Sequence, residues 1–288
     1  MKQLEAQLEE AVKCLLGEGP CYDEKTGILS WVDIKTGTLY KKKEGRVTSI
    51  QTGQYLGAAV PADSGNYVGV LTTGIYLITD KTIHKIYTLN EFHDFQRAND
   101  AKCDAEGRLW LGSMPLFEDD MDKGGNLYCY SMKAGCRLML GGTKISNGMA
   151  WSRDGQTMYY IDSARKQVDA FDYDMQNGMI GNRRKVIEIP VGVPDGMTID
   201  EEGMLWIALW GTGSVGRFCP ITGKMSERII VPALNVSSCC LGGPEGDILY
   251  ITTSGEGGGN GDGFLYSVHT GVRGLPVNRF DDRKWILQ

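Results

Sequence analysis

The chain has 288 residues, 42% of them hydrophobic and 23% charged, which suffices for one large domain or two ordinary domains with buried cores. Its net charge is −6, and no cluster of Lys and Arg is interleaved with aromatic residues, which argues against nucleic acid as a partner. No segment approaches the roughly 18 uninterrupted apolar residues of a membrane span, and the N-terminal segment MKQLEAQLEEAVKCLL has no signal-peptide core.

With no export signal in the sequence, we expect a cytoplasmic protein that has no membrane partner and whose eight cysteines are reduced thiols. Cys103, Cys129 and Cys239 lie among apolar neighbours and resemble small buried residues. The chain contains no CxxC and no Cys/His spacing typical of zinc. The cysteine pattern therefore argues against a zinc–thiolate site.

One phrase recurs along the chain: polar residues, a Gly, and then a short aromatic or β-branched run. In chain order its copies are DEKTGILSWVDI, ADSGNYVGVLTT, DAEGRLWLGSM, SRDGQTMYYIDS, DEEGMLWIALW and GPEGDILYITT. Their glycines are 38 to 48 residues apart, at Gly27, Gly65, Gly107, Gly155, Gly203 and Gly246. This period is typical of propeller blades. It predicts one all-β domain over residues 1–288, a six-bladed β-propeller with four-stranded antiparallel blades.

The fifth repeat illustrates the expected blade. We predict strands at 196–200, 204–210, 215–220 and 227–232, joined by turns. Amphipathic helical segments are almost absent, which argues against an α/β barrel. The segment Gln3–Leu8 is expected to pair into the last blade and close the ring, which would bring the two chain ends close together.

Residues eight or nine positions before each turn glycine are expected to start the inner strands, near the propeller axis. They are Glu18, Leu56, Asn99, Asn147, Asp195 and Ser238. Four of them are Glu, Asn, Asn and Asp, although buried carboxylates without partners are costly. Each alone would be an ordinary strand-end cap. Four at equivalent positions instead indicate one divalent cation, because carboxylate and amide oxygens are hard ligands. Asn99 is open to contact with substrate instead.

At these residues the chain resembles the regucalcin (senescence marker protein-30) family, which includes gluconolactonases and firefly luciferin-regenerating enzyme. The similarity covers nearly the whole chain. It is densest in LGEGP, RANDAKCDAEGR, SNGMAWS, YYIDS, VDAFDYD, PDGMTID and VSSCC. The resemblance implies a six-bladed propeller that hydrolyses lactones or related esters with one bound divalent cation.

The resemblance also implies roles for five residues. Glu18, Asn147 and Asp195 match the metal ligands, and Asp195 is also the general base. Arg97 and Asn99 match groups that orient the substrate. Ca²⁺ is the first candidate metal, with Zn²⁺, Mg²⁺ and Mn²⁺ as alternatives, because oxygen ligands discriminate poorly between them.

The chain departs from the family in two segments. Pro115, Leu116 and Phe117 follow GSM, where sugar-lactone hydrolases of the family carry acidic residues soon after the Met, so a contact to a substrate hydroxyl is expected to be missing. The late segment SGEGGGNGDGF, at 254–264, is rich in Gly and shorter than expected. Both departures concern the substrate more than the chemistry.

The expected function is that of a gluconolactonase-like hydrolase, in which the metal polarises the carbonyl and a general base activates water. Nucleophilic catalysis has little support, because there is no GxSxG and the three histidines lie outside the axial positions. Two alternatives stay open: an organophosphate or aryl-ester hydrolase on the same propeller, and a non-catalytic calcium-binding regulator. We expect a monomer or a weak homo-oligomer.

Overall fold

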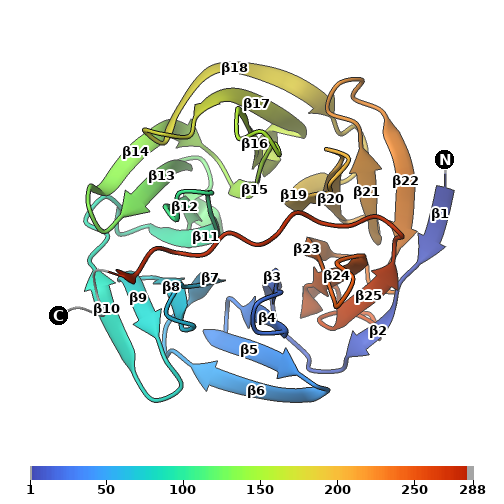
Figure 1. Cartoon of the computed structure of the whole chain (residues 1–288), viewed down its shortest axis with the longest axis horizontal. Helices are drawn as coiled ribbons and strands as arrows, with labels where there is room; N and C mark the ends of the chain where they lie inside the picture. The colour runs from blue at the N-terminus through green and yellow to red at the C-terminus, as the bar shows by residue number, and fades with distance from the viewer. Residues whose placement is uncertain (1, 284–288) are drawn as a thin grey trace.

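Six antiparallel sheets stand side by side around a central axis in the computed structural model, which describes residues 2–283 (Figure 1). Each sheet has one inner strand at the axis, and the next strands along the chain lie progressively further from it. The predicted six-bladed, four-stranded β-propeller is therefore confirmed. In blade order the strands are β3 Gly17–Asp23, β4 Ile28–Asp33, β5 Thr38–Lys43, β6 Arg46–Gln51; β7 Leu56–Pro61, β8 Tyr67–Leu71, β9 Gly74–Ile78, β10 Ile83–Tyr87; β11 Gln96–Cys103, β12 Leu109–Pro115, β13 Gly125–Ser131, β14 Gly135–Thr143; β15 Ser146–Trp151, β16 Thr157–Asp162, β17 Gln167–Asp174, β18 Met179–Glu188; β19 Val193–Ile199, β20 Leu205–Trp210, β21 Ser214–Phe218, β22 Met225–Ile230; and β23 Val236–Gly242, β24 Ile248–Thr253, β25 Leu265–His269.

The turn glycines of the repeat join the first and second strands of their blades. All six have positive φ, between 66° and 85°, a conformation that glycine adopts without steric cost. In the first blade, for example, the Gly27 N–H donates to Asp23 O at 2.8 Å and closes the turn. In the other five blades the glycine N–H bonds to the carbonyl three residues before it, so the repeat reflects a tight glycine turn at the same place in every blade.

The repeated Trp and Asp residues stabilise the blades internally. Trp110 and Trp206 are fully buried in the second strands of their blades. Their indole Nε1 atoms donate to Asp104 Oδ2 and Asp200 Oδ2, each at 2.9 Å. A buried indole N–H needs such a partner, so these two aspartates have a structural role.

The N-terminal segment closes the ring across two blades. β2 (Gln7–Glu10) pairs antiparallel with β25 and completes the last blade, as predicted for Gln7 and Leu8. The prediction is wrong for the residues before them, because β1 (Lys2–Glu5) pairs in parallel with β22 as a fifth strand of the preceding blade. The extended chain thus runs along two neighbouring outer edges, with Ala6 buried between them.

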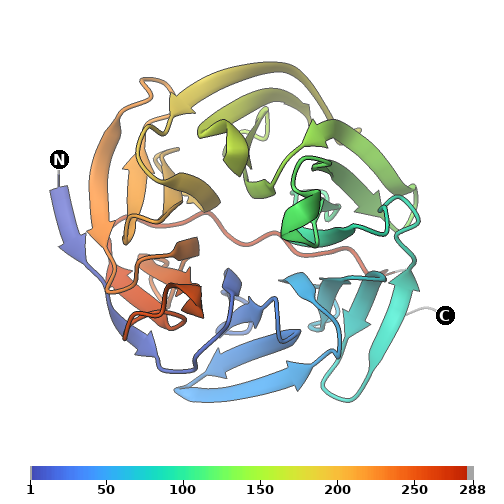
Figure 2. The ribbon, with the colours of Figure 1, turned by 180° about the vertical axis from the view of Figure 1, so that it is seen from behind.

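The C-terminal strap, which we define as residues 270–283, overturns the prediction that the chain ends lie together. It leaves β25 and crosses one face of the ring, in front in Figure 1 and behind in Figure 2. At its far end Phe280 is fully buried and forms a bridge with Ala62 of the second blade. The described chain ends therefore lie on different sides of the ring, since the strap carries one of them across it.

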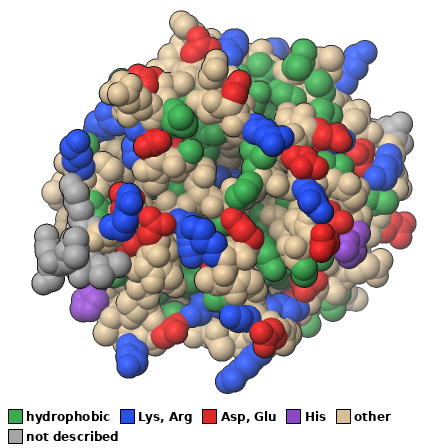
Figure 3. All heavy atoms as spheres, viewed as in Figure 1, with side chains coloured by type: hydrophobic (Ala, Val, Ile, Leu, Met, Phe, Trp, Pro, Cys, Tyr) green, Lys and Arg blue, Asp and Glu red, His purple; other side chains and the backbone are tan. Residues whose placement is uncertain are grey.

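Lys and Arg side chains are interspersed with Asp and Glu over the strap face (Figure 3). All eight cysteines are free thiols. The helices described in residues 2–283 are three-residue 3₁₀ turns at Glu118–Asp120 (η1), Ser163–Arg165 (η2) and Gly255–Gly257 (η3). Within that range we find no helix with the length and apolarity needed to cross a membrane.

Candidate functional site

Each inner strand is irregular at the position predicted to face the axis. Pairing shifts between Ala98 and Ala101 in β11, between Ser146 and Met149 in β15, and between Pro194 and Met197 in β19. Asn99, Asn147 and Asp195 lie inside these three irregularities, and Glu18 begins the one in β3. A bulge interrupts strand pairing and redirects side chains, so these four polar residues share one local backbone feature.

The glycines that follow Asn147 and Asp195 allow neighbouring inner strands to approach closely. A Cβ on Gly148 would lie 2.7 Å from Asp195 O, and one on Gly196 would lie 2.1 Å from Ser238 Oγ. Real side chains do not tolerate such distances. The SNG and PDG motifs therefore combine a polar residue with a glycine whose missing side chain lets the inner strand of the next blade pack closely.

Glu18 and Asp195 are buried carboxylates, 6% and 8% exposed. Burial, and next the charge of Asp100, raise the pKa of Glu18 to about 8. Burial and then the charge of Glu18 raise the pKa of Asp195 well above its usual range. Within residues 2–283 neither forms an ion pair. The two carboxylates thus repel each other, and none of the described basic side chains contacts them.

A chain of hydrogen bonds joins the other predicted residues. Arg97 Nη1 donates to Asn99 Oδ1 at 2.9 Å, and Asn99 Nδ2 donates to Asn147 Oδ1 at 3.1 Å. Asn99 Nδ2 also donates to Ser146 O at 3.0 Å. Asn147 Nδ2 donates to Ser163 Oγ at 2.8 Å. Arg97, Asn99 and Asn147 therefore form one connected polar group across two blades.

Arg97 is a basic residue whose charge lowers the pKa of both carboxylates. It is 8% exposed, and burial lowers its pKa to about 10, although the charges of Glu18, Tyr55 and Asp195 act in the opposite direction. These interactions bring Arg97 and both carboxylates into one electrostatic unit. The structure thus gathers the five predicted site residues at one part of the axis.

Two residues of this group were missed from the sequence. Asp100, 8% exposed, follows Asn99 in the same bulge, and its charge raises the pKa of both Glu18 and Asp195. Ser163 is the first residue of η2, directly after β16, and contacts Asn147. Asp100 is the acidic residue of the RAND motif, which was a visible signal. It was missed because counting back from the turn glycine selects only one residue in each strand.

The donor set fits a hard divalent cation. Among residues 2–283 no three His, Cys, Asp or Glu side chains form a metal-binding group, but the predicted set has two carboxylates and an amide. No Lys, Arg or His side chain of the described residues forms an ion pair with Glu18 or Asp195. Asn147 Oδ1 accepts a hydrogen bond from Asn99, so the oxygen of its amide lies on the side of Asn99. Two negative charges and a neutral oxygen are ligands that Ca²⁺, Mg²⁺ or Mn²⁺ prefer.

Residues 16–255 match the family model described as the SMP-30/Gluconolactonase/LRE-like region. The chain belongs to this family. "Putative sugar lactone lactonase YvrE" of Bacillus subtilis (strain 168) is 35% identical over 259 residues, which are 88% of this chain and 88% of that protein. Regucalcin of Danio rerio is 37% identical over 248 residues, 83% of each chain. A solved luciferin-regenerating enzyme superposes with a TM-score of 0.88 at 28% identity, covering 96% of this chain and 99% of that one.

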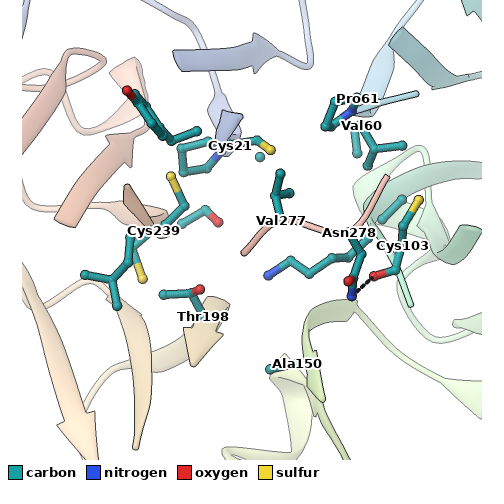
Figure 4. Close-up of a pocket in the computed structure, with 18 of the residues that line it drawn as sticks. Cys21, Val60, Pro61, Cys103, Ala150, Thr198, Cys239, Val277 and Asn278 are labelled. Atoms are coloured by element: carbon teal, nitrogen blue, oxygen red, sulfur yellow. Dashed lines mark hydrogen bonds between the residues drawn. The ribbon is translucent and has the colours of Figure 1, made fainter. Parts of the chain in front are cut away.

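In this member of the SMP-30/gluconolactonase family, a cavity of about 120 Å³ lies further along the axis, under the strap (Figure 4). Residues from all six inner strands and from the strap line it, among them Cys21, Cys103, Cys239 and Val277. Asn278 Nδ2 donates to Cys103 O at 3.2 Å and ties the strap to its wall. None of the five predicted site residues lines this cavity, but Asp100 of the same group does, so the cavity adjoins the predicted site.

The two segments that depart from the family lie near Arg97. Leu116 shares a groove of about 410 Å³ with Tyr55, and its N–H donates to the carbonyl of Phe95, two residues before Arg97, at 2.7 Å. Phe117 is 60% exposed. On the Gly-rich segment, Glu256 forms an ion pair with Lys35 and also acts on the pKa of Arg97. A carboxylate of the Gly-rich segment thus acts on the arginine, and Leu116 lies in a neighbouring groove.

Proposed function

We propose that this chain hydrolyses sugar lactones with one divalent cation held by Glu18, Asn147 and Asp195. The observation that carries the proposal is the pair of buried carboxylates, which form no ion pair within residues 2–283 and lie in the same electrostatic unit as Arg97. The substrate class is supported by the Bacillus subtilis relative, whose name is that of a sugar lactone lactonase. Ca²⁺, Mg²⁺ and Mn²⁺ all accept three oxygen ligands, and Ca²⁺ is the first cation to test.

Each residue has a chemical task in this proposal. A bound divalent cation would supply a Lewis acid for the ester carbonyl. Asp195 would take a proton from the attacking water, a general-base contribution of about 10²–10⁴ in rate. Arg97 would bind ring or hydroxyl oxygens of the substrate through Nη2 and Nε, because only Nη1 makes hydrogen bonds within the described residues.

Asn99 is proposed to orient the substrate from its carbonyl side. Its amide nitrogen donates to both Ser146 O and Asn147 Oδ1, which uses its two hydrogens. Its Oδ1 accepts from Arg97 and keeps one lone pair for a substrate hydroxyl. Asn99 therefore links the substrate side of the site to the metal side.

Two other functions use the same residues. An organophosphate or aryl-ester hydrolase would need the same buried carboxylates and cation. A calcium-binding regulator is favoured by the name regucalcin among the relatives and would bind the cation without turnover. The cytoplasmic location and the monomeric or weakly associated state stay predictions from the sequence.

A substrate panel separates these functions. The protein, supplied with Ca²⁺, is assayed with a pH indicator on glucono-δ-lactone, δ-valerolactone, paraoxon and phenyl acetate. We expect hydrolysis of the lactones with kcat/KM at least about tenfold above that for paraoxon and phenyl acetate. A preference for paraoxon or phenyl acetate would replace the lactonase by the first alternative. Ca²⁺ binding without turnover of any compound would favour the regulator.

A further inference from the structure

We propose that Ser163 is a positioning residue that determines which way round the Asn147 amide lies. The inference rests on the proposed function, in which Asn147 Oδ1 is a metal ligand. Ser163 begins η2, directly after β16, and its Oγ accepts from Asn147 Nδ2 at 2.8 Å. An Asn side chain offers an oxygen on one side and a nitrogen on the other, so the side that faces the metal must be chosen by its neighbours.

One end of the hydrogen-bond chain is a group that only accepts. The Ser163 hydroxyl donates to Pro194 O at 2.7 Å, and a backbone carbonyl has no hydrogen to give. The single hydrogen of Ser163 is thereby used, and the hydroxyl presents a lone pair to Asn147. Only the NH₂ side of the Asn147 amide meets that lone pair favourably.

The other end is a group that only donates. Arg97 gives a hydrogen bond to Asn99 Oδ1 at 2.9 Å, so Asn99 must present its NH₂ to Asn147. Asn147 therefore accepts with Oδ1 on the side that faces Asn99. Both ends of the chain therefore require the same orientation, and a flipped Asn147 would place nitrogen against nitrogen and oxygen against oxygen.

Burial makes Ser163 the partner that water does not replace. Ser163 and Asn147 are each 3% exposed. The Ser163 backbone is held in place because its N–H donates to Ile145 O at 3.0 Å. Its hydroxyl contacts the residue immediately before Asp195, so it also spans the boundary between the fourth and fifth blades. Ser163 thus connects two of the three proposed metal ligands.

The test is calcium binding by titration calorimetry on metal-stripped protein, with four forms of residues 147 and 163. Ser163→Ala should weaken Ca²⁺ binding about 10–100-fold, the usual effect of losing a group that orients a ligand. In the Asn147→Asp background, Ser163→Ala should change the Ca²⁺ affinity by less than about threefold. A carboxylate has an oxygen on both sides, so no wrong orientation exists.

Controls separate positioning from folding. Ser214→Ala removes another buried, hydrogen-bonded serine hydroxyl, in β21, and should leave Ca²⁺ affinity unchanged. If Ser163→Ala does not fold, Ser163→Cys keeps the shape with a weak acceptor and should also lose affinity. Unchanged affinity in Ser163→Ala, or an equal loss in both backgrounds, would overturn the inference. A wild-type protein that binds none of Ca²⁺, Mg²⁺, Mn²⁺ and Zn²⁺ would overturn the metal site itself.

Discussion

Asn99 and Asn147 meet amide to amide between the third and fourth blades, with 3.1 Å from Asn99 Nδ2 to Asn147 Oδ1. The contact joins a proposed substrate group to a proposed metal ligand. It also connects Arg97, on the far side of Asn99, to Ser163, on the far side of Asn147. Substrate binding and metal binding should therefore respond to changes at either end of this chain.

Arg97 should act mainly in substrate binding. In Arg97→Ala the donors for substrate oxygens are lost, while the three proposed metal ligands remain. We expect KM for glucono-δ-lactone to rise at least about tenfold, the usual value of a charge-assisted hydrogen bond, with a smaller change in kcat. Steady-state kinetics at saturating Ca²⁺ measures both. Arg97→Lys keeps the charge but not the bidentate geometry, so its KM should lie between those of the wild type and Arg97→Ala. An unaltered KM in Arg97→Ala would remove the arginine from the substrate site.

Glu18 should make the metal-free protein less stable as pH rises. Its pKa is about 8 in the folded chain, against 4.5 for an ordinary glutamate, because of burial and the charge of Asp100. A carboxyl with a raised folded pKa holds its proton better in the folded state. Its contribution is therefore complete below the unfolded pKa of 4.5 and is lost as pH rises through about 8.

Thermal unfolding in the presence of a chelator measures this effect. We expect the Tm of the metal-free protein to fall across that pH range, and Glu18→Gln to reduce the slope, because an amide does not titrate. Added Ca²⁺ should raise the Tm most at the alkaline end, where both carboxylates are charged. A metal-free Tm that rises with pH, with no difference in Glu18→Gln, would contradict the account of this carboxylate.

Phe280 should be the main anchor of the C-terminal strap. Its ring is fully buried in a cluster with residues of the second and third blades, and it stacks on Tyr130 with 5.9 Å between ring centroids. Phe280→Ala should lower the free energy of unfolding by about 3–5 kcal/mol. Denaturant unfolding measures the loss. Val277→Ala, in the same strap but only partly buried, should cost about 1 kcal/mol. Equal costs for the two would show that Phe280 is not the anchor.

Leu116 should reduce the preference for hydroxylated lactones. An aliphatic side chain accepts no hydrogen bond from a sugar hydroxyl, whereas a polar site strongly rejects analogues that lack the hydroxyl. We expect kcat/KM for glucono-δ-lactone to exceed that for δ-valerolactone by less than about a thousandfold, or ~4 kcal/mol. Leu116→Glu should increase the ratio. A larger ratio in the wild type would mean that other groups bind the hydroxyls, with Glu256 the first candidate because it lies near Arg97.

The blade number could be predicted because each blade uses one tight turn with glycine at positive φ, and that turn recurs in the sequence. The positions of the axial residues could be predicted because each lies eight or nine residues before this turn, inside an inner strand. Asp100 was missed because a bulge brings two successive residues into the site, and Ser163 because it reaches Asn147 from η2, after the next strand.

The strap had no signal of this kind. Residues 270–283 form no strand, and their backbone is held by isolated bridges and hydrogen bonds to turns of several blades. Gly274 N donates to Gly246 O at 2.9 Å and Asp281 N to Gly107 O at 3.1 Å, one in the sixth blade and the other in the third. Such contacts depend on the closed ring, so they follow from the assembled fold and not from local sequence.

The central claim is that Asp195 and its neighbours catalyse lactone hydrolysis with a divalent cation. The most direct measurement is the rate of glucono-δ-lactone hydrolysis by metal-stripped wild-type and Asp195→Asn proteins, before and after addition of Ca²⁺, Mg²⁺, Mn²⁺ or Zn²⁺. We predict that at least one cation restores turnover in the wild type, and that kcat in Asp195→Asn stays lower by about 10²–10⁴-fold, since an amide takes no proton from water. Full activity without metal, or in Asp195→Asn with metal, would contradict the account.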